Sequence, residues 1–226
     1  KDFNETTKKL DAVRRCTSEG FKCEKIVMEK LKHFVSKEAF NIDGFGKKIV
    51  ESFWNLKLIK FPHDIFNLNY KKIKNLEGWG NLSVSNLKYA IENSKKISLE
   101  RFIYSLGIRH IGLENAKLLA EHLKSPENFF KLSNKININE LSIIDGIGET
   151  QIKSIGTFFS NHQNIDMLLK LKKILNITNI QKINNSGKLK NMTFMLTGKL
   201  IGISRAEAKS IIEQNSGKII NNVNKK

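Results

Sequence analysis

A glycine–apolar–glycine tripeptide recurs along this chain and constrains the fold more than any other feature. It reads GFG at 44–46, GWG at 78–80 and GIG at 146–148, and a looser form, LGIRHIG, occupies 106–112. The last glycines of the four motifs, Gly46, Gly80, Gly112 and Gly148, are separated by 34, 32 and 36 residues. Helical solenoids have a similar period, but the signature residues of those repeats are missing from this sequence. The repeating unit is therefore a glycine turn between two segments of helical periodicity.

Each turn is expected to join two helices and to leave an anion site at the start of the second helix. A short turn between helices needs backbone angles that residues with a Cβ resist and glycine adopts cheaply. The apolar residue between the glycines (Phe45, Trp79 or Ile147) is expected to fill the gap between the helices. The second glycine precedes a helix whose first N–H groups are free and whose dipole is positive there, so a phosphate oxygen can approach closely. For one isolated motif, a plain helical hairpin turn without a ligand is the alternative.

The charge balance indicates a polyanionic partner. The 226 residues contain 39 Lys and Arg against 22 Asp and Glu, a formal net charge of +17, which favours nucleic acid or an anionic membrane surface. Two cysteines are too few for a disulfide-stapled secreted fold, and the sequence has no apolar run of membrane-spanning length. We therefore expect a soluble, intracellular protein without a membrane partner. Because the chain begins without Met, we also expect it to be a piece of something longer.

Side chains beside the turns rank the four predicted phosphate sites. Lys47 and Lys48 follow the first turn, Asn81 follows the second, and Arg109 and His110 lie on the third. In the fourth, Glu149 stands beside Gly148 and would repel phosphate, so this site is expected to be the weakest. Because backbone amides contact phosphates but not base edges, binding should be salt-sensitive and independent of base sequence. The predicted DNA-binding residues are Gly44, Gly46, Lys47, Lys48, Gly78, Gly80, Asn81, Arg109, His110, Gly112, Gly146 and Gly148.

The predicted fold class is mainly α, a tandem helix-hairpin-helix domain followed by the start of a small α/β module. Residues 25–173 are expected to be almost wholly helical, and the Asn- and Lys-rich segment after them is expected to be a linker. A strand at 192–198, a helix beginning at the Ser204/Glu207 capping box and a second strand then give a β-α-β order. The predicted division is 1–32, a partial zinc-finger-like segment with a helical lead-in; 33–175, the domain of four hairpins; 176–190, the linker; and 191–226, the truncated α/β segment.

The cysteines, Cys16 and Cys23, can supply half of a tetrahedral thiolate zinc site. The nearest histidine, His33, is a possible third ligand, although it fits equally well as a satisfied histidine on a helix. Within these residues alone, two unligated thiols are favoured over a closed metal site.

Together these motifs resemble the C-terminal half of bacterial NAD-dependent DNA ligases over nearly the whole chain. RCTSEGFKC running into LKHFVSKEAFNIDGFG resembles the second half of that family's four-cysteine zinc finger and its first helix-hairpin-helix. LEGWG, LERFIYSLGIRHIG and IDGIG follow in the family's order, and SGKLKNMTFMLTGKL with SRAEAKSIIE resembles the opening of its BRCT domain. The first cysteine pair of the family is missing here, six residues rather than five separate the two cysteines present, and the BRCT-like segment stops before its later strands.

The resemblance implies that the parent enzyme seals nicks in duplex DNA, using NAD to adenylate a lysine, with magnesium as a further cofactor. The adenylated lysine and the NAD pocket would lie outside this chain, which would have no catalytic residue and be inactive alone. Its part would be to grip the DNA backbone and minor groove around the nick without sequence specificity. Zinc would take two of its four ligands from Cys16 and Cys23. The protein is expected to be a monomer in the bacterial cytoplasm, associated with the nucleoid.

Two other functions compete with this one. A stand-alone helix-hairpin-helix DNA-binding or nuclease-accessory protein would have the same hairpins, with incidental cysteines. A phosphopeptide-binding protein acting through Thr197 and Gly198 would need BRCT residues beyond Lys226. The order of cysteine pair, HFVS, hairpins and TGKL…SRAEA favours the ligase segment.

Overall fold

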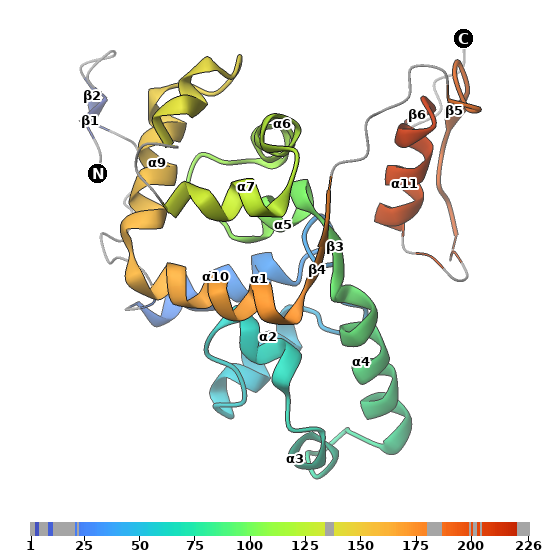
Figure 1. The fold of residues 1–226 in the computed structure, drawn as a ribbon. Coiled ribbons are helices and arrows are strands. Elements are labelled where there is room, and N and C mark those ends of the chain that lie inside the picture. Colours follow the sequence, from blue (N-terminus) through green and yellow to red (C-terminus); the bar gives the residue numbers. More distant parts are fainter. Residues whose placement is uncertain are drawn as a thin grey trace.

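The chain folds into a helical body followed by a small β-α-β module (Figure 1). The computed structural model describes residues 3–4, 9–10, 21, 23–133, 138–179, 187–198, 200, 203 and 205–220. Two short strands, β1 (Phe3–Asn4) and β2 (Lys9–Leu10), pair in antiparallel fashion near the N-terminus. The predicted mainly α fold with a small α/β module is confirmed.

Helices make up most of the body, and four of them begin directly after a predicted hairpin turn. These four are α2 (Lys47–Asn55), α4 (Asn81–Ser94), α6 (Leu113–Leu123) and α9 (Glu149–Ser160). The described residues of the body also form the helices α1 (Glu24–Phe34), α3 (Tyr70–Lys74), α5 (Leu99–Ser105), α7 (Pro126–Phe130) and α10 (His162–Ile174), with 3₁₀ turns η1 (Pro62–Asn67), η2 (Lys131–Ser133) and η3 (Glu140–Ile143).

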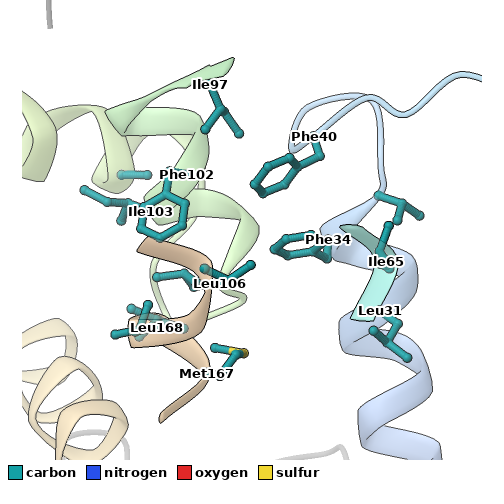
Figure 2. Close-up of a cluster of buried hydrophobic side chains, with 14 of the residues drawn as sticks. Leu31, Phe34, Phe40, Ile65, Ile97, Phe102, Ile103, Leu106, Met167 and Leu168 are labelled. Atoms are coloured by element: carbon teal, nitrogen blue, oxygen red, sulfur yellow. The ribbon is translucent and has the colours of Figure 1, made fainter. Parts of the chain in front are cut away.

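An apolar core rich in phenylalanine lies beneath the hairpins. Figure 2 shows Phe34 and Phe40 facing Phe102 and Leu106 across the interior. The rings of Phe34 and Phe40 stack with centroids 4.2 Å apart, and Phe34 and Phe102 are almost wholly buried. Because aromatic side chains bury large areas and pack with defined geometry, this core fixes the helices that carry the turns.

The helical body also contains a short parallel pair of strands, and the sequence did not predict this pair. Strand β3 (Lys96–Ser98) pairs in parallel with β4 (Asn176–Thr178), and Ile97 is buried opposite Ile177. The segment 25–173 therefore contains a strand between α4 and α5. The expected linker, 176–190, begins with a strand instead, because Ile177 packs against the core while its flanking residues pair with β3.

The C-terminal module has the expected strand-helix-strand order. Strands β5 (Thr193–Phe194) and β6 (Lys218–Ile219) are parallel and are connected through α11 (Arg205–Gln214). The first strand is shorter than the predicted 192–198. The N–H of Leu189 donates to the carbonyl of Asn215, so the module includes the end of the expected linker as well. Ser204, the first residue of the predicted Ser204/Glu207 capping box, lies outside the described residues.

Candidate nucleic-acid interface

All four predicted turns share one backbone geometry. In each, the N–H of the central apolar residue donates to the carbonyl three residues earlier, over 3.0 to 3.1 Å. The pairs are Phe45 to Ile42, Trp79 to Leu76, Ile111 to Ile108 and Ile147 to Ile144. A positive φ at the residue before the donor makes these turns resemble type II. The looser motif at 106–112 thus forms the same hairpin as the three others.

The left-handed position of the turn is glycine in three hairpins and histidine in the third. Gly44, Gly78 and Gly146 have φ of +74°, +79° and +88°, and His110 takes their place with φ of +63°. Gly107, the first glycine of LGIRHIG, also has a positive φ but lies at the end of α5, outside the turn. Histidine is one of the residues that tolerate this region at modest cost. The structure therefore gives His110 a backbone role, while its side chain is exposed beside the exposed Arg109.

The central apolar residues fill the turns as expected. Phe45, Ile111 and Ile147 are at most 5% exposed. Trp79 is half-buried, with its ring centroid 5.5 Å from that of Phe53 in α2. The hairpins are therefore fixed to the core from inside, which leaves their outer faces available.

The second glycine of every hairpin is the N-cap of the following helix. Gly46, Gly80, Gly112 and Gly148 have extended backbone conformations and give no side-chain cap to α2, α4, α6 and α9. Other helices of the body are capped differently: the side chains of Asn69, Ser125 and Asn161 accept hydrogen bonds from first-turn amides of α3, α7 and α10. Helices α1 and α5 also have no side-chain cap, at Cys23 and Ser98, so a missing cap alone does not distinguish the hairpin helices. The N-cap of each hairpin helix is a glycine directly after a turn, and it leaves first-turn N–H groups to an outside acceptor.

Access distinguishes the first three hairpins from the fourth, whereas an exposed first-turn glutamate is found in both the third (Glu114) and the fourth (Glu149). A Cβ added at Gly46, Gly80 or Gly112 would meet no atom within 4 Å, whereas one at Gly148 would lie 3.4 Å from Oε1 of Gln151. Lys47, Lys48 and Asn81 are exposed in the first turns of α2 and α4. Glu149 is exposed at the start of α9. The structure thus brings the predicted residues to the outer faces of the hairpins, and whether they contact DNA stays a prediction.

A cluster of charges behind the first hairpin was not found from the sequence. Nζ of Lys32, on α1, lies 2.8 Å from a carboxylate oxygen of Glu29 and 2.8 Å from one of Glu51, on α2. Its hydrogen bonds to Glu29 and then Glu51 raise the pKa of Lys32, and the Lys32 hydrogen bond lowers the pKa of Glu51. The spacing of Glu29 and Lys32 was a possible signal for half of this cluster, but the contact to Glu51 depends on how α1 packs against α2.

His33 has a structural role in the described part of the chain. Its Nε2 lies 2.7 Å from the carbonyl oxygen of Tyr104, and its ring meets the Tyr104 ring edge-on at 4.6 Å. Because a carbonyl only accepts, Nε2 must donate here. The ring joins α1 to α5, as expected for a satisfied histidine.

The predicted zinc ligands lie at the edge of the described residues. Cys23 is the half-buried N-cap of α1, with a free thiol, and Cys16 lies outside the described residues. Among the residues that the structure describes, no group of three or more His, Cys, Asp or Glu side chains is placed to hold a metal. Nor is any helix in that part of the chain both long and apolar enough to cross a membrane.

Comparison with known proteins supplies relatives for the whole chain. Residues 101–168, from α5 into α10, match the model of the helix-hairpin-helix motif. The chain is 71% identical over all 226 residues to a DNA ligase of Pelagibacter ubique, of which it covers 33%. A DNA ligase of Rickettsia massiliae is 41% identical over 221 residues, which are 92% of this chain. One of Wolbachia pipientis is 42% identical over 205 residues, which are 88% of this chain. The chain spans about a third of the length of these relatives.

Proposed function

We propose that this chain, which is homologous along its whole length to a segment of the DNA ligases, is the DNA-gripping portion of an NAD-dependent ligase that seals nicks in duplex DNA. It holds the sugar–phosphate backbone and minor groove around the nick, and binding and positioning are its contribution to the reaction. The alternative of a stand-alone helix-hairpin-helix protein is not favoured, because the relatives that match along the chain are ligases.

The observation that carries this proposal is the set of uncapped helix N-termini behind Gly46, Gly80, Gly112 and Gly148. A phosphate oxygen placed there accepts charge-assisted hydrogen bonds from first-turn amides and lies at the positive end of the helix dipole. The net charge of +17 attracts the duplex over longer distances and makes affinity depend on salt.

The hairpins should contribute unequally. The first has open amides together with two exposed lysines, so it is the strongest of the four sites. The second and third have open amides, with Asn81 and Arg109 as neighbouring donors. The fourth has Glu149 beside its cap and the Gln151 side chain close to Gly148, so it supports the fold more than it binds phosphate.

The cofactors follow from the ligase family and belong to the proposal. NAD and magnesium would act at the adenylation site, in a portion of the enzyme outside this chain, which is inactive by itself. Cys16 and Cys23 would give zinc two thiolate ligands, and the metal would fix the segment that leads into α1. The complete enzyme would act as a monomer on nicked duplex DNA, in the bacterial cytoplasm at the nucleoid.

The test is binding of this 226-residue chain to a nicked duplex across a salt series, beside the double variant Gly46→Val with Gly80→Val. Both glycines have negative φ and open space where a side chain would stand, so valine fits the fold but occupies the approach of a phosphate. The expected result is a loss of about 100-fold or more, because each of the two sites loses at least one hydrogen bond to a charged acceptor, and such bonds contribute about 1.5–3 kcal/mol each.

Gly156→Val is the matched control. Gly156 lies within α9, away from the hairpin turns, and a Cβ there meets no atom within 4 Å. This variant should bind as the wild type does. If the wild type fails to bind the nicked duplex, or the double variant binds as tightly as the control, the hairpins do not bind phosphate and the proposal is wrong.

A further inference from the structure

The strongest predicted phosphate site contains a carboxylate that should weaken it. Lys47 and Lys48 occupy the first two positions of α2, and Glu51 follows them at i+4 and i+3 on the same helix. Residues at these spacings are neighbours on a helix surface, and opposite charges there pair readily. A lysine paired with Glu51 would have to break that pair before it could bind a DNA phosphate.

In the structure, Glu51 pairs with a lysine on another helix. Its carboxylate accepts from Nζ of Lys32 at 2.8 Å, across the contact between α1 and α2. The Lys32 side chain is only 14% exposed, whereas that of Glu51 is 47% exposed. Lys32 is therefore held in the interface between α1 and α2, where it pairs with the more exposed Glu51. Glu29, at 2.8 Å on the other side, keeps the ammonium group in place.

We propose that Lys32 is a positioning residue for DNA binding: it holds Glu51 against α1 and so leaves Lys47 and Lys48 free to pair with phosphate. This inference rests on the proposed function, since it assigns a role within the first hairpin's phosphate site. Lys32 does not touch the DNA in this arrangement. It acts through the carboxylate that would otherwise compete with the DNA for the two lysines.

The pKa of Glu51 agrees with Lys32, and not Lys47 or Lys48, being its main partner. The Lys32 hydrogen bond is the main cause that lowers the pKa of Glu51, and the charges of Lys47 and Lys48 act in the same direction more weakly. An unperturbed glutamate is ionised at neutral pH as well. Loss of Lys32 would therefore leave a negative Glu51 without its main partner, beside two lysines on its own helix.

The experiment compares four forms of the 226-residue chain: the wild type, Lys32→Met, Glu51→Gln and the double variant. Each is measured for nicked-duplex affinity across a salt series, with helicity by circular dichroism. Lys32→Met should bind about three- to tenfold more weakly with a shallower salt slope, because part of the charge of Lys47 and Lys48 becomes neutralised. Glu51→Gln should bind as well as the wild type or better. The double variant should recover to within about twofold of Glu51→Gln, since no carboxylate then remains to compete.

Recovery of DNA affinity in the double variant distinguishes a positioning role of Lys32 from a purely structural role. A separate control tests the loss of one positive charge. If Lys32 only stabilised the α1–α2 contact, the double variant would bind as weakly as Lys32→Met, and the inference would be overturned. Lys95→Met is the matched control for loss of one positive charge, because Lys95 pairs with Glu92 at 2.8 Å at the far end of α4. It should weaken binding less than Lys32→Met does, and an equal loss also overturns the inference.

The two proposals fail in different ways. If the wild type does not bind the nicked duplex, the proposed function is wrong and the role of Lys32 is wrong with it. If the wild type binds, the variant at Gly46 and Gly80 binds weakly, and Lys32→Met binds as the wild type does, only the role of Lys32 is overturned.

Discussion

The first and fourth hairpins have the same backbone conformation, but the residues that follow their turns have opposite charges. Both turns place a glycine in the left-handed region, bury an apolar residue and start a helix at an uncapped glycine. After that glycine, the first hairpin has two exposed lysines and the fourth has an exposed glutamate. The difference indicates that the turn is first a folding device, and that the residues after it decide whether the exposed helix N-terminus becomes a phosphate site.

The folding role common to both turns predicts the largest effects. Phe45→Ala removes a ring that is 1% exposed and packs edge-on to Phe53, with centroids 5.5 Å apart, and should cost about 3–5 kcal/mol of unfolding free energy. Ile147→Ala, from a site 5% exposed, should cost about 2–5 kcal/mol. Urea denaturation of the two variants measures both values. A loss below about 1 kcal/mol at either turn would mean that its central residue is not part of the core.

The turn itself was predictable from the sequence, because its cause is local. A left-handed backbone position, a buried central residue and a helix start all lie within a few residues, and glycine marks two of the three. His110 shows the limit of that signal: the third hairpin has a histidine where the others have glycine, so the glycine–apolar–glycine pattern is incomplete there.

Contacts between distant segments were not predictable in the same way. Strands β3 and β4 have three residues each, so neither has enough alternation to be recognised alone. Their pairing depends on where α10 ends relative to α5. The contact of Lys32 with Glu51 depends likewise on the packing of α1 on α2. Such features follow from the assembled core and leave only weak local patterns.

Single glycine substitutions should distinguish the first hairpin from the fourth. Gly46→Val should weaken nicked-duplex binding by about tenfold, since it obstructs first-turn amides that would bind a charged oxygen. Gly148→Val should weaken it by less than about twofold, because this site has an adjacent carboxylate and a side chain close to its cap. Affinities at one fixed salt concentration give the comparison, with circular dichroism to verify helicity. Equal losses at the two sites would show that backbone amides dominate and that neighbouring charges do not rank the hairpins.

Reversing the charge of the fourth hairpin should make it resemble the first. Glu149→Lys replaces an exposed carboxylate with an ammonium group at the start of α9 and should strengthen binding by about threefold. The slope of log affinity against log salt should steepen by about one if the new lysine neutralises one phosphate. Because a lysine at a helix N-terminus opposes the dipole, thermal stability should fall slightly at the same time. An unchanged slope would mean that the fourth hairpin does not face the DNA.

The smallest effect concerns access to the fourth site. Oε1 of Gln151 lies 3.4 Å from where a Cβ on Gly148 would stand, and the other three capping glycines have no atom within 4 Å of that position. Gln151→Ala should open this approach and strengthen binding by no more than about twofold, since Glu149 remains. Combined with Glu149→Lys, the same change should add to the gain, because the added lysine makes a phosphate at the site favourable. A loss of affinity in Gln151→Ala would have the opposite meaning: the Gln151 amide would itself donate to the DNA, and the fourth hairpin would bind through a side chain where the first binds through its backbone and lysines.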